Sequence, residues 1–85
     1  METAENRLRR LRLRAWHRGI REMDLVLGGF ADAGLADLEP GLLDAFDTLL
    51  SEDDHDLYGW IAGRTGVPVR FEAIVGRIRL HRGLA

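Results

Sequence analysis

Apolar residues recur at intervals of three and four along most of the sequence, and this spacing constrains the fold more than any other feature. On an α-helix such positions fall on one face, whereas alternation at intervals of two, which is typical of a half-buried strand, is weak throughout. Glycines and two prolines interrupt the pattern at short distances, so each helix must be short. The sequence therefore predicts an all-α fold, a small bundle of about five short helices.

The first two helices are expected on either side of Gly19. We expect the first to begin near Asn6, a residue type that caps helix N-termini, and to end near His17 or Arg18. The second then carries an apolar set toward the core, namely Ile20, Met23, Val26, Leu27 and Phe30. A single continuous helix with Gly19 in its interior is the alternative, at a cost of about 1 kcal/mol relative to alanine.

Three more helices are expected in the remainder of the chain. Pro40 predicts the start of one of them, because the first turn of a helix does not need the missing N–H. Asp53 or Asp54 caps the next, which Gly66 ends, and the last helix frays near His81. Their apolar positions are Leu42, Leu43, Phe46, Leu49, Leu50, Leu57, Tyr58, Trp60, Ile61, Phe71, Ile74, Val75 and Ile78.

The length of 85 residues predicts one domain, residues 1–85, with residues 1–6 flexible. A domain of this size buries roughly 60 to 65% of its unfolded surface, which leaves little room for an enclosed active site. The absence of cysteine excludes disulfides and thiolate chemistry. Early acids at Glu2 and Glu5 and the lack of an apolar leader argue against a signal peptide or mitochondrial presequence, and no apolar run suits a membrane span. We expect a cytoplasmic protein without membrane insertion.

Charge is divided along the chain. Seven arginines and no acid lie from Arg7 to Arg21, and eleven acids and no arginine from Glu22 to Asp56; five more arginines follow from Arg64 onward. We expect the basic ends to fold against the acidic middle. The alternative is a small nucleic-acid-binding or regulatory module whose N-terminal arginines contact phosphates, although the net charge of −2 disfavours it.

Catalytic and metal-binding patterns are absent from the sequence. His17, His55 and His81 are too far apart to form a helical metal-binding pair, and the acids around His55 point in different directions on a helix. Ser51 is the only serine and lacks the glycines of a nucleophile elbow. We therefore expect no metal site, no catalytic residue and no enzyme activity.

One short stretch combines features that suit a binding surface. Arg18, Gly19 and Glu22 stand at i, i+1 and i+4, which on a helix places Arg18 and Glu22 on one side with Gly19 between them. Glycine allows close approach of a partner, the guanidinium and carboxylate offer a donor fork and an acceptor, and Trp16 offers an apolar anchor. The same spacing is also typical of a surface ion pair worth a few tenths of a kcal/mol beside a glycine cap, so spacing alone does not assign a function.

Two stretches nevertheless resemble a known family. Trp16-His17-Arg18-Gly19-Ile20-Arg21-Glu22-Met23-Asp24 resembles the Arg-Gly-x-x-Glu signature of the succinate dehydrogenase assembly factors, which promote covalent attachment of FAD to the flavoprotein subunit. Asp53-Asp54-His55-Asp56-Leu57-Tyr58-Gly59-Trp60-Ile61 resembles the Asp-x-Asp-Leu-(Phe/Tyr)-x-Trp segment of the same family. The likeness covers roughly residues 10 to 80. His17 departs from the arginine that many members carry at that position, which bears on the choice of partner.

The resemblance implies a partner and the residues that bind it. Arg18, Gly19 and Glu22, with Asp24 beside them and Trp16 as an anchor, would bind the flavoprotein subunit of succinate dehydrogenase. In bacteria the resemblance extends to the flavoprotein of fumarate reductase. FAD and the histidine that becomes linked to it belong to the partner, so no cofactor is expected to be bound stably by this chain.

The second stretch contributes mainly to the core in this interpretation. Tyr58 and Trp60 are expected to be largely buried, with Trp60 or Asp56 at the border of the interface. A free-FAD carrier is disfavoured because no dinucleotide fold fits in this length. We expect a monomer, since a small factor must release its client.

Overall fold

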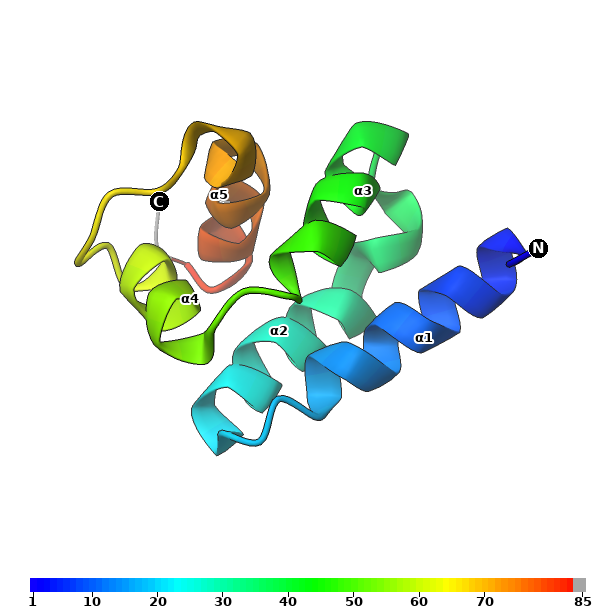
Figure 1. The fold of residues 1–85 in the computed structure, drawn as a ribbon, viewed down its shortest axis with the longest axis horizontal. Helices are drawn as coiled ribbons and strands as arrows, with labels where there is room; N and C mark the ends of the chain where they lie inside the picture. Colours follow the sequence, from blue (N-terminus) through cyan, green and yellow to red (C-terminus); the bar gives the residue numbers. More distant parts are fainter. Residues whose placement is uncertain (84–85) are drawn as a thin grey trace.

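The computed structural model describes residues 1–83, and within that range the regular secondary structure is helical throughout, as predicted. Short 3₁₀ turns at Leu35–Asp37 and Val69–Phe71 precede the third and fifth helices (Figure 1). The α-helices are α1 (Ala4–Trp16), α2 (Arg21–Gly34), α3 (Pro40–Leu49), α4 (Asp54–Ile61) and α5 (Glu72–His81).

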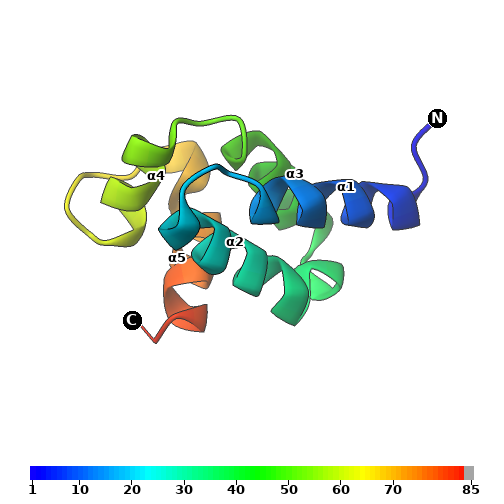
Figure 2. The same ribbon diagram turned by 90° about the horizontal axis from the view of Figure 1, so that it is seen from below.

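Helices α1 and α2 lie side by side and are joined by a turn at residues 17–20 (Figure 1). Helix α5 packs against α2, α3 and α4. In both ribbon views α4 lies at the end of the molecule close to the 17–20 turn, while the N-terminus lies at the opposite end (Figures 1 and 2). The fold thus brings the two family-like stretches together at one end.

Helix α1 begins earlier than the sequence predicts, and Asn6 is not its cap. The hydroxyl of Thr3 accepts a hydrogen bond from the backbone N–H of Asn6 at 3.1 Å, which makes Thr3 the N-cap. Residues 4–6, which we expected to be flexible, are therefore helical. The carboxylate of Glu2 accepts a hydrogen bond from Arg10 at 2.7 Å and ties the preceding residues to the helix.

Gly19 separates α1 from α2, so the alternative of one continuous helix is wrong. Its φ of +95° lies in the region that favours glycine. Ile20, predicted to face the core, is instead the extended N-cap residue of α2 and is 50% exposed, so that prediction is wrong as well. The other inward positions predicted for α2 are buried, namely Met23, Val26, Leu27 and Phe30.

The core joins all five helices, and its largest fully buried side chains include Phe46 and Phe71. Trp60 is 8% exposed, as predicted, whereas Tyr58 is only partly buried and packs at the edge of the core. Gly28 allows α1 to approach α2, because a Cβ there would lie 2.2 Å from Cδ2 of Trp16. In α2 Ala31 is buried as well, and the buried apolar residues outside α2 are Leu11, Ala15, Leu35, Leu38, Phe46, Leu49, Leu50, Leu57, Trp60, Ile61, Phe71, Ile74, Val75 and Ile78.

The basic N-terminal helix packs against acids of α3, which confirms the predicted pairing of charges. Asp47 accepts hydrogen bonds from Arg10 at 3.0 Å and Arg7 at 3.3 Å, and lies 3.5 Å from Arg14. The hydrogen bond from Arg10 is the main cause that lowers the pKa of Asp47. Arginines of the C-terminal part also approach middle acids, in the pairs Arg70–Glu52, Arg77–Glu39 and Arg82–Glu22.

Between residues 1 and 83, no helix combines the length and the apolar character needed to cross a bilayer.

Candidate functional site

Arg18 lies in the turn before α2, so the predicted alignment of Arg18 and Glu22 on one helical face is wrong. The guanidinium points into the protein and contacts the connection between α3 and α4. Its Nε donates to Oδ1 of Asp54 at 2.8 Å, Nη2 donates to the carbonyl of Glu52 at 2.7 Å, and Nη1 donates to the carbonyl of Leu50. The side chain is 11% exposed. The donor fork that the sequence suggested for a partner is used within the chain.

Asp24 holds the other side of the same turn. Its Oδ1 accepts a hydrogen bond from the backbone N–H of Arg18 at 2.6 Å, and its own N–H donates to the carbonyl of Ile20 at 2.9 Å. Arg18 is therefore fixed through both its backbone and its side chain. The conformation of the turn follows from these contacts and from the positive φ of Gly19.

The turn presents an exposed surface on its outer side. Apart from the two neighbours of Gly19 in the chain, no heavy atom of residues 1–83 lies within 4 Å of the place a Cβ would take there, so a partner can approach the backbone. Glu22 is 53% exposed at the start of α2, with Oε1 3.6 Å from a guanidinium nitrogen of Arg82. Ile20 and Leu25 are 50% and 51% exposed. We call Gly19, Ile20, Arg21, Glu22 and Leu25 the motif face.

Trp16, predicted as an anchor for a partner, packs within the chain. Its ring covers Gly28, and its Nε1–H donates to Asp32 at 3.1 Å. The side chain is half-buried. Of the two residues predicted at the border of the interface, Asp56 is exposed and Trp60 is buried. The roles of all three toward a partner stay predictions.

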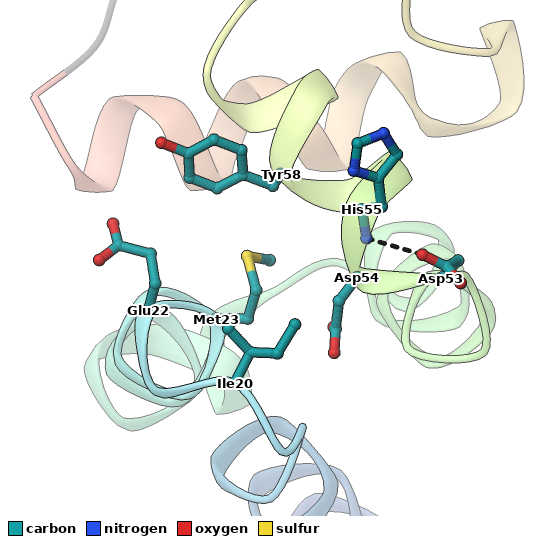
Figure 3. A pocket seen from close by; sticks show the side chains of 7 residues that line it. All are labelled: Ile20, Glu22, Met23, Asp53, Asp54, His55 and Tyr58. Atoms are coloured by element: carbon teal, nitrogen blue, oxygen red, sulfur yellow. Dashed lines mark hydrogen bonds between the residues drawn. The ribbon is translucent and has the colours of Figure 1, made fainter.

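A hollow of about 660 Å³ lies beside the motif face, between the start of α2 and the start of α4 (Figure 3). Three of its lining side chains are carboxylates and none is an arginine or lysine. Asp54 is engaged by Arg18, and Asp53 caps α4 by accepting the N–H of His55 at 2.8 Å, as the sequence predicts. The lining consists of Ile20, Glu22, Met23, Asp53, Asp54, His55 and Tyr58.

Sequence reasoning missed this hollow because its two walls are far apart in the chain. One wall comes from the Arg-Gly-x-x-Glu stretch and the other from the second family-like stretch. The signal that could have joined them is the pair of opposite charges at Arg18 and Asp54, which now form the bridge between the stretches.

Metal binding and nucleic-acid binding are the other kinds of chemistry weighed from the sequence. No group of three or more side chains of metal-ligand type converges in residues 1–83. Among the N-terminal arginines, those that contact carboxylates, a hydroxyl or carbonyls within the chain are Arg7, Arg10, Arg14 and Arg18. These contacts compete with phosphate binding and weaken the nucleic-acid alternative.

Comparison with known proteins places these residues in context. A family model described as "Flavinator of succinate dehydrogenase" matches residues 9–82, which include the motif face and the hollow. "Succinate dehydrogenase assembly factor 2, mitochondrial" of Mycosarcoma maydis is 39% identical over 70 residues, which cover 82% of this chain and 29% of that protein. "FAD assembly factor SdhE" of Acetobacter pasteurianus is 37% identical over 62 residues, which cover 73% of this chain and 57% of that protein.

A third relative shows the same pattern of coverage. "Succinate dehydrogenase assembly factor 2, mitochondrial" of Dictyostelium discoideum is 36% identical over 64 residues, or 75% of this chain and 45% of that protein. Each of these matches thus spans less than two thirds of the relative's own length. No solved structure matches the chain significantly.

Proposed function

The chain belongs to the family of flavinators of succinate dehydrogenase, and from this membership we propose that it is an assembly factor for the flavoprotein subunit of succinate dehydrogenase. In this proposal it binds the flavoprotein and promotes the covalent attachment of FAD. The match over residues 9–82 is the observation that carries the proposal. The names of the relatives from a bacterium, a fungus and an amoeba support the same role.

The chain acts in this proposal by binding and not by catalysis. The client flavoprotein carries both FAD and the histidine that becomes linked to it. A helper that holds these groups in a near-attack arrangement accelerates the step without supplying a reacting atom. The carboxylates around the hollow, Glu22, Asp53 and Asp54, would repel the phosphates of a dinucleotide, which supports a factor that binds the loaded client and does not store FAD itself.

The motif face is the proposed contact with the client. Gly19 offers open space for a backbone of the partner, and Glu22 offers an exposed carboxylate. Arg18 and Asp24 act in this proposal as supports, because their contacts with each other and with the α3–α4 connection set the position of Gly19. A preorganised turn lowers the ordering cost of binding.

The proposal includes three further statements that need their own tests. The flavoprotein of fumarate reductase is a second client, which a parallel co-expression examines. The factor acts as a monomer in the cytoplasm, although the fungal relatives are named as mitochondrial. Light scattering of the purified chain and fractionation of cells that express it address these two points.

Co-expression with the client flavoprotein tests the proposal directly. Flavin fluorescence of the flavoprotein band on a denaturing gel reports covalent attachment, and we expect strong labelling only when the chain is present. Glu22→Ala should reduce labelling, whereas Glu72→Ala, which removes an exposed first-turn acid from α5, serves as the matched control and should not. Equal labelling with and without the chain would overturn the proposal.

A further inference from the structure

We propose that the hollow between α2 and α4 receives an arginine side chain from the client flavoprotein. The inference rests on the proposed function and adds the chemistry of the contact that sits next to the motif face. Three features of the hollow carry it: the character of its lining, the availability of its carboxylates, and its continuity with Gly19 and Glu22 through Ile20.

The lining suits a side chain that is apolar along its stem and cationic at its end. Ile20 and Met23 come from the start of α2, and Tyr58 faces them from α4 (Figure 3). These three side chains offer an apolar surface for methylene groups. The remaining lining within residues 1–83 consists of three carboxylates and His55, with no arginine or lysine, so the hollow favours a cation over an anion.

The three carboxylates of the hollow differ in the ion pairs and hydrogen bonds that they already form within the chain. Asp54 is committed to Arg18 at 2.8 Å, whereas Asp53 has no ion-pair partner among residues 1–83 and accepts only a backbone N–H. Glu22 lies 3.6 Å from Arg82, and it is 53% exposed. An exposed pair at that distance contributes little to stability, so a partner can replace Arg82 at small cost.

The arrangement favours arginine over lysine. The Glu22 carboxylate and the Tyr58 hydroxyl lie at the same end of the hollow (Figure 3). A planar guanidinium can donate to both the carboxylate and the hydroxyl while its flat face rests on apolar groups, whereas an ammonium has donors but no flat face to place on them. The ring of Tyr58 already has the guanidinium of Arg64 at 5.4 Å from its centroid, which illustrates that it accepts this type of contact.

Calorimetric titration with the purified client flavoprotein tests the inference on the whole chain. Asp53→Asn removes a charge from the hollow and keeps a good N-cap, so α4 should remain intact. We expect it to weaken binding about tenfold and to flatten the salt dependence of the affinity. Asp37→Asn removes an exposed acid from the 3₁₀ turn that follows the C-terminal end of α2 and should leave the affinity unchanged.

A second measurement does not depend on the client. The ¹⁵N-labelled chain is titrated with N-acetyl-arginine amide and, separately, with the neutral isostere N-acetyl-citrulline amide. Shift changes at Ile20, His55 and Tyr58 that appear with arginine and not with citrulline support the inference. Equal changes with both compounds, or none with either, would overturn it.

The two assays separate failure of the inference from failure of the proposed function. If Asp53→Asn binds the client as tightly as the original chain while Glu22→Ala does not, the function stands and the hollow is not the arginine site. If the client does not bind at all but arginine selectively shifts the hollow, the basic-side-chain site stands and the identity of the partner is wrong.

Discussion

Replacing Arg18 by alanine should lower the free energy of unfolding, because its side chain supports the end of the molecule that carries the motif face. The guanidinium donates to Asp54, Glu52 and Leu50, and the side chain is only 11% exposed. Its removal leaves two carbonyls and one carboxylate of the α3–α4 connection without their donor. The backbone hydrogen bond to Asp24 remains, so the turn loses one of its two supports.

The magnitude follows from the number and type of these hydrogen bonds. A hydrogen bond to a charged group contributes about 1.5 to 3 kcal/mol, and bonds that share one guanidinium are not additive. Breaking a largely buried ion pair costs about 3 to 5 kcal/mol, and we take the lower end because solvent reaches part of the site. For a domain of this size a loss of about 3 kcal/mol lowers Tm by about 12 to 24 °C.

Thermal and urea unfolding followed by circular dichroism measure this loss. Arg18→Lys keeps the charge but can satisfy fewer of the acceptors, so we expect an intermediate stability. Arg12→Ala is the control, because Arg12 is exposed on α1 and has no ion-pair partner among residues 1–83; it should change stability by less than about 0.5 kcal/mol. Equal urea midpoints for Arg18→Ala and Arg12→Ala would refute the structural role of Arg18.

Three further substitutions test the ion pairs between α1 and α3, the packing of α1 against α2, and the turn at Gly19. Asp47→Asn should lower stability by about 1 kcal/mol at neutral pH. The hydrogen bond from Arg10 lowers the pKa of Asp47 in the folded chain. The difference in the free energy of unfolding between the two chains should therefore be complete above the ordinary aspartate pKa and disappear as the pH falls through the lowered value. Urea unfolding between pH 2 and about 7 measures this difference. Gly28→Ala should lower Tm in calorimetry by more than about 8 °C, since its Cβ would collide with Trp16. Gly19→Ala should cost about 1 kcal/mol in the same assay through its φ of +95° alone, because the space around it is open.

The sequence predicted the helices well where periodicity and capping chemistry agree. Pro40 begins α3 and Asp53 caps α4, because each residue satisfies or avoids a specific backbone hydrogen bond at a helix start. Asn6 and Thr3 are both residue types that cap helices, and only the fold decides between them. Ile20 was misplaced for a related reason: its spacing fits the buried stripe of α2, but the helix begins one residue later.

The candidate site was harder to predict from the sequence than the helices. Residues at i and i+4 share a face only if both lie on one helix. Arg18 lies outside both helices, because Gly19 forms part of the turn between the end of α1 and the start of α2 at Arg21. The inward direction of Arg18 depends on acceptors more than thirty positions away, at Leu50 and Glu52. Tertiary contacts of this kind leave no local pattern in a single sequence.

Arg18 and Glu22 therefore have different roles, although their spacing at i and i+4 suggests that they act together on one surface. Arg18 donates to the α3–α4 connection and to Asp54 at the start of α4, and so links the turn before α2 to the start of α4, which lines the hollow. Glu22, in the first turn of α2, keeps an exposed carboxylate at the edge of that hollow. Loss of either residue should weaken client binding, but only loss of Arg18 should also lower the free energy of unfolding. Measuring both quantities on the same variants distinguishes a support from a contact.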